Sequence, residues 1–320
     1  MEYIILIVSL VGIVYGADFL VAGAVSIAKK YKVSDFVIGA AIVGVGTSMP
    51  ELVVSFLGAI GGNADVAIGN VVGSNIFNVL GILGVTAMFF PIATDKANMK
   101  FEIPLCIFVS LLVTVLALNF FNGTPATISR TDGLVLLCCF VLFMWYSFYR
   151  DRKNAANASQ SETKQEETDQ SPLWLAIVKV IGGLAILITS CDFFVDNAVL
   201  IAKSLGVNDA FISLTLIACG TSLPELAASV VAAVKKNTQM ALGNIVGSNI
   251  FNITLILGLS SQVMPLTSAG ITSVDYAVMI SAAVIPLILG FTGKINRFSG
   301  AIMFLGFIGY TWYLLNGQIA

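Results

Sequence analysis

The sequence predicts an all-α polytopic membrane protein with ten transmembrane helices arranged as two inverted five-helix repeats. Of its 320 residues, 58% are hydrophobic and only 11% are charged, whereas a soluble domain carries about 25% charged residues. Several apolar runs reach the roughly 20 residues that a helix needs to cross about 30 Å of hydrocarbon. An internal duplication predicts that the helices form two related halves.

The duplication is gapless. Residues 18–85 align with residues 192–259 at a constant offset of 174 residues, with 33 identities in 68 positions. GTSMPELVVS begins at Gly46 and GTSLPELAAS at Gly220, and each is followed by a GN-x-VGSNIFN run that begins at Gly69 or Gly243. Polar residues inside apolar segments are therefore among the best-preserved positions between the copies.

Apolar stretches and their polar boundaries predict the elements in order. Helices are expected near residues 3–28, 34–60, 65–90, 100–119, 131–149, 173–202, 208–234, 239–264, 273–291 and 297–316. The first repeat then spans residues 1–149 and the second residues 173–320. Residues 150–172 are rich in Asn, Ser, Gln and Glu, which predicts a disordered linker. The first segment lacks a basic n-region and a clear cleavage site, so we expect it to be retained.

The distribution of Lys and Arg predicts the orientation. With the N-terminus outside, thirteen of these residues fall in inner loops, Arg130 and Lys203 fall in outer loops, and Lys179 lies near an inner helix end. This positive-inside bias predicts a plasma (inner) membrane protein with both termini outside and a cytoplasmic linker. Because five helices per repeat is an odd number, the second repeat enters the membrane from the opposite side. Such inverted repeats are typical of transporters, whose substrate site lies near the midplane between the repeats.

Helices two and seven each carry one glutamate, Glu51 or Glu225, within an apolar segment. A charged side chain at the bilayer centre costs at least ~2.5 kcal/mol to insert, and equivalent positions of inverted repeats meet at the axis that relates them. We therefore expect the two glutamates to share one functional site. Hydroxyl side chains that precede each acid by three or four residues share its helix face: Thr47 and Ser48 in the first copy, Thr221 and Ser222 in the second.

A proline lies directly before each glutamate. Pro50 and Pro224 cannot donate a backbone hydrogen bond, and each ring clashes with the carbonyl four residues back, at Gly46 or Gly220. We therefore expect both helices to break at these glycines and to expose carbonyl oxygens. Irregular backbone at membrane depth is tolerated only inside protein or beside a watery cavity.

Helices three and eight complete the expected oxygen-rich site. They contribute two pairs four residues apart, Ser74 with Asn78 and Ser248 with Asn252. Carboxylate, hydroxyl, amide and main-chain oxygens are hard ligands that suit Ca²⁺, and the set has no soft ligand for zinc or copper. Any one of these Ser, Thr or Asn residues could instead serve helix packing.

Two further repeated features favour structural roles. Glycines of the GN-x-VGSN runs are expected to permit close helix packing: Gly69, Gly73, Gly243 and Gly247. Asp18 and Asp192 occupy equivalent positions nearer a membrane interface than the glutamates, where capping or ion pairing is expected and a role in gating stays open.

Composition also excludes several functions. The absence of histidine excludes histidine metal sites and Ser-His triads. The five cysteines lie in predicted membrane segments without CxxC spacing and are interpreted as apolar packing residues. The sequence has no basic patch that would indicate nucleic-acid binding, and it has no nucleotide-binding loop that would indicate an ATP-driven pump. We therefore expect that the protein is not an enzyme and needs no cofactor. We also expect it to lie in the lipid bilayer without an obligatory protein partner.

The two motifs resemble the α-repeats of the cation/Ca²⁺ exchanger superfamily, and most closely those of prokaryotic sodium/calcium exchangers. The resemblance implies a ten-helix antiporter that extrudes Ca²⁺ as Na⁺ enters. It implies cation ligands at Gly44, Thr47, Ser48, Glu51, Ser74, Asn78, Ala218, Thr221, Ser222, Glu225, Ser248 and Asn252, with Gly44 and Ala218 acting through main-chain oxygens. Several members have aspartate in place of Asn252, so this chain departs from them in having only two acids in the inferred site.

Two carboxylates can balance one Ca²⁺, whereas an empty site would carry bare charge through a poorly solvated state. Exchange by alternating access is therefore expected to be obligatory. An H⁺/Ca²⁺ exchanger of the same fold stays open as an alternative, because protons also neutralise glutamates. A K⁺-dependent Na⁺/Ca²⁺ exchanger of the same fold also stays open. A passive cation channel is a more distant alternative. An intramembrane protease is disfavoured because the chain lacks a GxGD motif and a histidine–serine dyad.

Overall fold

The computed structural model describes residues 1–96, 98–118, 127–158, 172–205, 218–267 and 270–317. Within these ranges, eight helices are long and apolar enough to cross a membrane, and one bent helix pair raises the number to nine. The prediction of an all-helical membrane protein is confirmed. The expected helix at residues 208–234 begins outside the described ranges, so the predicted number of ten is not tested.

The first half follows the expected order with π-helical insertions. Its helices are α1 (Glu2–Tyr31), α2 (Asp35–Ile38), π-helix η1 (Gly39–Gly44), α3 (Val45–Thr47), α4 (Met49–Ile60), α5 (Ala64–Ile76), π-helix η2 (Phe77–Leu83), α6 (Gly84–Phe89), π-helix η3 (Asn98–Glu102), α7 (Ile103–Leu118) and α8 (Arg130–Ala158). Side-chain caps start two of them: Ser34 accepts from the N–H of Val37, and Asn63 from that of Val66.

The second half repeats this pattern. Its described helices are α9 (Leu173–Ser204), α11 (Ala218–Gly220), α12 (Leu223–Val234), α13 (Thr238–Phe251), π-helix η5 (Asn252–Ile256), α14 (Leu257–Val263), α15 (Ser273–Leu289), 3₁₀-helix η6 (Gly290–Thr292) and α16 (Arg297–Gly317). Asn237 caps α13 as its equivalent Asn63 caps α5. Thr272 and Asp275 form a reciprocal capping box at the start of α15.

Two short antiparallel strand pairs join loops from the two halves. Strand β1 (Ile92–Ala93) pairs with β4 (Lys294–Ile295), and β2 (Thr127–Ile128) pairs with β3 (Leu266–Thr267). The charge-based topology assigns the β1 and β4 loops to one side of the membrane and the β2 and β3 loops to the other. The strand pairs therefore join loops that this topology places on the same side.

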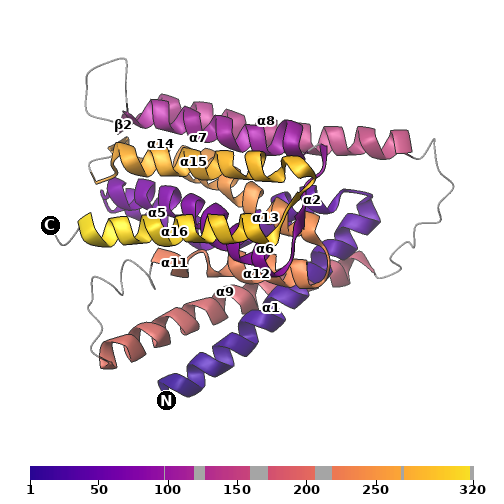
Figure 1. Cartoon of the computed structure of the whole chain (residues 1–320), viewed down its shortest axis with the longest axis horizontal. Coiled ribbons are helices and arrows are strands. Elements are labelled where there is room, and N and C mark those ends of the chain that lie inside the picture. The colour runs from indigo at the N-terminus through magenta and orange to yellow at the C-terminus, as the bar shows by residue number, and fades with distance from the viewer. Residues whose placement is uncertain (97, 119–126, 159–171, 206–217, 268–269, 318–320) are drawn as a thin grey trace.

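Helices α1 and α9 pack along each other at one flank of the bundle, as Figure 1 shows. Glycines permit the close approach: a Cβ on Gly16 would lie 2.6 Å from the Leu187 nitrogen, and one on Gly183 would lie 2.5 Å from the Leu20 nitrogen. Many large apolar side chains of this pair are exposed, including those of Ile7 and Ile181. Such outward-facing apolar surface is what a lipid environment requires.

Within the core, α13 packs against the segment α2–η1. Added Cβ atoms on Gly243 and Gly247 would collide with the backbone of Phe36 and Ala40, which confirms the packing role expected for these two glycines. An added Cβ on Gly69 would lie 3.2 Å from the Cδ1 atom of Ile271, and one on Gly73 would meet no atom of the described residues within 4 Å, so the packing role of these two glycines stays a prediction.

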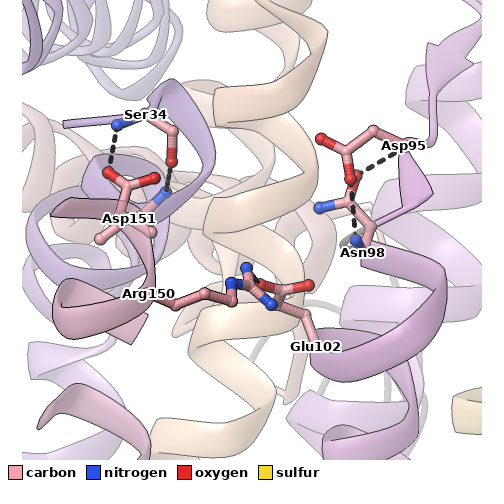
Figure 2. Close-up of polar contacts among 7 residues, drawn as sticks. Ser34, Asp95, Asn98, Glu102, Arg150 and Asp151 are labelled. Carbon is pink, nitrogen blue, oxygen red and sulfur yellow. Dashed lines mark hydrogen bonds and ion pairs between the residues drawn. The ribbon is translucent and has the colours of Figure 1, made fainter. Parts of the chain in front are cut away.

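Helix α8 corrects one expectation. The sequence predicted a helix end at residue 149 and disorder from Arg150, but the helix continues to Ala158. Arg150 forms an ion pair with the fully buried Glu102 and stacks over the Phe101 ring. Asp151 accepts a hydrogen bond from the main-chain N–H of Ser34, at 2.6 Å. Figure 2 shows Arg150 beside Glu102 and Asp151 beside Ser34, two contacts that tie this part of α8 to η3 and to the residue before α2.

Candidate cation site

Both copies of the GTS-x-PE motif interrupt a helix at the serine. Ser48 has φ −82° and ψ 9°, and Ser222 has φ −92° and ψ 10°. The first break bends the chain by 48° between the segments Asp35–Thr47 and Met49–Ile60. The breaks were expected at Gly46 and Gly220 and lie two residues later. Pro50 and Pro224 occupy the first turn of the following helix, where a missing N–H costs nothing.

Each glutamate accepts a hydrogen bond from the serine of the other copy. Ser48 Oγ donates to Glu225 Oε1 at 2.7 Å, and Ser222 Oγ donates to Glu51 Oε1 at 2.7 Å. All four side chains are 0% exposed. The structure therefore brings the two predicted acids together between the halves.

Other predicted ligands surround this pair. Ser74 Oγ lies 3.5 Å from Glu51 Oε1 and 3.1 Å from Ser222 Oγ. The carbonyl oxygen of Gly44 accepts from Ser248 Oγ at 3.3 Å and from the main-chain N–H of Ser48 at 3.1 Å. The Gly44 carbonyl therefore meets a hydroxyl group of the second copy, and its role as a main-chain cation ligand remains a prediction.

The second copy is described less completely. Ala218 lies in the short helix α11, which packs against α5, and the residues just before it are outside the described ranges. Thr221 is half-buried, and its Oγ1 atom is buried. The role of the Ala218 carbonyl therefore remains a prediction.

Sequence reasoning missed a pair of supporting asparagines. Asn70 Nδ2 donates to the main-chain oxygen of Glu51 at 3.1 Å and to Ser55 Oγ at 2.9 Å. Asn244 makes the equivalent bonds to the Glu225 oxygen at 3.2 Å and to its serine at 2.8 Å. These bonds hold the backbone that carries each carboxylate. The identity of these residues between the two copies was a signal that could have revealed them.

A second missed pair links the two halves directly. Asn75 Nδ2 donates to the main-chain oxygen of Asn249, and Asn249 Nδ2 donates to that of Asn75, both at 3.2 Å. The Oδ1 atoms of this pair accept from the predicted ligands: Asn249 Oδ1 from Asn78 Nδ2 at 3.1 Å, and Asn75 Oδ1 from Asn252 Nδ2 at 3.2 Å. The predicted ligands Asn78 and Asn252 are thus connected through residues that were not predicted.

Five buried oxygens of the predicted ligands have no hydrogen-bond partner within the described part of the chain. They are Glu51 Oε2, Glu225 Oε2, Asn78 Oδ1, Asn252 Oδ1 and Thr221 Oγ1. Leaving a buried polar group unsatisfied costs roughly 1–3 kcal/mol, and more for a charged group. Five such oxygens from four helical segments are the donor set that a hard cation would satisfy.

Three π-helical segments border these ligands. Segment η1 ends at Gly44, η2 includes Asn78 and η5 begins at Asn252. A π-helix shifts the hydrogen-bond register by one residue and is frequent at functional sites. No sequence signal predicted these segments.

The structure supports an ion-pairing role for Asp18. Its carboxylate lies 2.6 Å from Lys235 Nζ, which joins α1 to the end of α12. Gly61 stands at the position equivalent to Lys235, so this pairing cannot recur at Asp192. Among the described residues, no group of three or more His, Cys, Asp or Glu side chains converges. The candidate site thus depends on two acids together with neutral oxygens.

Comparison with known proteins gives a consistent result. The sodium/calcium exchanger protein family matches residues 1–149 and 175–316. The chain is 39% identical over 319 residues to CaxA of Alkalimonas amylolytica, with 98% of each chain covered. It is 33% identical over 339 residues to the sodium/calcium exchanger MaX1 of Methanosarcina acetivorans, with 97% of each covered.

A solved structure shares the fold. The sodium-calcium exchanger NCX_Mj, soaked with zero Na⁺ and Ca²⁺, superposes with a TM-score of 0.82 at 31% identity, and the match covers 98% of each chain. These relatives are transporters rather than enzymes, as the sequence predicted. The chain belongs to the sodium/calcium exchanger protein family and is a cation/Ca²⁺ antiporter.

Proposed function

We propose that this chain exchanges Na⁺ for Ca²⁺ at one site between two inverted five-helix repeats, and that it extrudes Ca²⁺. The observation that carries the proposal is the set of five buried oxygens on the predicted ligands that have no hydrogen-bond partner among the described residues. Glu51 and Glu225 would supply the charge that balances Ca²⁺, and the neutral oxygens would complete its coordination. Ca²⁺ and Na⁺ are the transported substrates, and no cofactor is required.

The full proposed ligand set retains the predicted residues. It comprises the carboxylates of Glu51 and Glu225, the hydroxyls of Thr47, Ser48, Ser74, Thr221, Ser222 and Ser248, the amide oxygens of Asn78 and Asn252, and the carbonyl oxygens of Gly44 and Ala218. The bonds between Ser48 and Glu225 and between Ser222 and Glu51 support a shared site, because each serine belongs to the copy opposite its glutamate. Cation binding would draw these oxygens away from their mutual hydrogen bonds and toward the ion.

Obligatory exchange follows from the charge of this site. Empty, it would carry two carboxylates through a closed state with little water, which is costly. Loaded with Ca²⁺ or with Na⁺, it is neutralised, so only the loaded protein would change its access from one side to the other. This alternating access requires no chemistry beyond ion binding.

The proposed setting is the plasma (inner) membrane, with ten helices, both termini outside and residues 150–172 in the cytoplasm. The asymmetry of Lys and Arg favours this orientation. The pairing of β1 with β4 and of β2 with β3 agrees with the assignment of these loops to common sides. Residues 1–149 and 173–320 are proposed as the two repeats, with no obligatory protein partner.

The test is uptake of ⁴⁵Ca²⁺ into proteoliposomes of the purified chain, with Na⁺, K⁺ and H⁺ gradients imposed separately. An outward Na⁺ gradient alone should drive uptake. Uptake driven only by a pH gradient would favour the proton-coupled alternative, and Ca²⁺ current without a counter-ion would favour a channel.

A further inference from the structure

We propose that Asn75 and Asn249 are positioning residues that determine which end of the Asn252 and Asn78 amides faces the transported cation. This inference rests on the proposed function, because it concerns the same cation site. Asn75 and Asn249 need not touch the ion. They act by fixing the orientation of amides that would touch it.

The argument starts from main-chain carbonyls, which can only accept hydrogen bonds. The side chain of Asn249 contacts the carbonyl oxygen of Asn75 at 3.2 Å, so it must present its NH₂ group there. Its Oδ1 atom then points to the neighbouring Asn78, 3.1 Å away. Since two acceptors cannot bond to each other, Asn78 must present its own NH₂ group to Asn249.

The orientation of Asn78 leaves its oxygen available. Asn78 is 0% exposed, and its Oδ1 atom has no hydrogen-bond partner among the described residues. The same sequence of bonds runs in the other half, from the Asn249 carbonyl through Asn75 to Asn252, whose Oδ1 atom is equally buried and unpartnered. Two copies of one arrangement thus present two amide oxygens and withhold two NH₂ groups.

The orientation of each amide decides whether it attracts or repels the cation. An amide oxygen coordinates a hard cation, whereas an NH₂ group directs partial positive charge toward it. Without Asn249, nothing in this network would prevent the Asn78 amide from turning by 180° about its last torsion. Half of its rotational states would then oppose binding.

The experiment measures Na⁺-gradient-driven ⁴⁵Ca²⁺ uptake by full-length protein in proteoliposomes. Asn249→Ala should raise the KM for Ca²⁺ by about twofold, the equivalent of about 0.4 kcal/mol, with the maximal rate per folded protein little changed. In the Asn78→Asp background, both ends of the side chain are oxygens, so orientation no longer matters. There, Asn249→Ala should not raise the KM.

The matched control is Thr254→Val, which removes a buried hydroxyl from the π-helix that follows α13. Within the described ranges, Thr254 Oγ1 donates to the Ile250 carbonyl, at 2.5 Å, and the substitution should leave the KM unchanged. Asn249→Ser, which loses less packing, should raise the KM in the same way. The equivalent cycle of Asn75→Ala with Asn252→Asp should also show a rise in KM that disappears in the aspartate background.

A purely structural role would give a different result. It would lower the thermal midpoint equally in both backgrounds and leave the KM unchanged, or raise the KM equally in both, and either outcome overturns the proposal. If wild-type protein shows Na⁺-driven uptake but the cycle shows no difference, only this inference fails. If wild-type protein shows no such uptake, the proposed function fails and the inference fails with it.

Discussion

Replacing Glu225 by glutamine perturbs the site without changing its shape. Glu225 Oε1 accepts from Ser48 Oγ at 2.7 Å, and Oε2 has no partner in the described chain. In Glu225→Gln, the amide oxygen can keep the bond to Ser48, which places an NH₂ group where the free oxygen was. The substitution therefore removes one of two charges and directs a donor at the ion. Glu51→Gln should do the same through Ser222.

The expected loss of Ca²⁺ affinity is large. A carboxylate oxygen about 2.4 Å from Ca²⁺, at an effective dielectric constant of about 20, contributes about 332 × 2/(20 × 2.4), or about 14 kcal/mol, of gross attraction. Desolvation of both charges cancels much of this. If only a third of it survives, the loss is about 4–5 kcal/mol, which lowers the affinity by more than about 1,000-fold.

The assay is Ca²⁺ titration of purified protein by calorimetry, combined with Na⁺-driven ⁴⁵Ca²⁺ flux. The matched control is Glu102→Gln, which removes the charge of another fully buried glutamate, one that pairs with Arg150 outside the site. The control should retain Ca²⁺ affinity. If Glu51→Gln or Glu225→Gln stayed folded and lost less than about tenfold, or about 1.4 kcal/mol, the charge-balance reasoning would be refuted.

Other predictions concern topology, stability and ion choice. A cysteine introduced by Ser161→Cys should resist an impermeant reagent in intact cells, and labelling there would reverse the orientation. Arg150→Met should leave the buried Glu102 charge without its partner and cost about 3–5 kcal/mol of stability. The thermal midpoint in detergent should therefore fall, and it should recover in the double variant that also carries Glu102→Gln. An unchanged midpoint would contradict the ion pair. Exchange should not require K⁺, because Asn252 supplies no formal charge. Asn252→Asp should alter cation selectivity more than protein abundance, and an absolute K⁺ requirement in choline medium would contradict the ion-choice argument.

Much of the helical framework could be predicted because apolar length and Lys/Arg placement are local signals. The helix expected at 173–202 is α9, Leu173–Ser204, and α12 ends at Val234, where its end was expected. The helical continuation of α8 was missed because residues 150–158 are largely polar. The contact of Arg150 with Glu102, which lies 48 residues away, is not a local signal. The amino-acid composition near residue 150 does not reveal such a contact.

The residues of the candidate site could be predicted where their side chains are unusual for a membrane helix. Glu51 and Glu225 were recognisable because acids are costly in apolar helices, and the duplication led to the prediction that they share one site. Asn75 and Asn249 were identical between the copies but were not singled out, because an asparagine in a membrane helix equally suits packing. Their role depends on which carbonyl each side chain meets, and this is a property of the folded helix pair.

The most direct measurement of the central claim is competition between the two ions at equilibrium. Binding of ⁴⁵Ca²⁺ to purified protein is measured at increasing Na⁺, with choline keeping the ionic strength constant. If both ions use the Glu51–Glu225 site, Na⁺ should raise the apparent Kd for Ca²⁺ without changing the number of Ca²⁺ sites, more steeply than in proportion to Na⁺ concentration. Ca²⁺ binding that is indifferent to Na⁺ would contradict a shared exchange site.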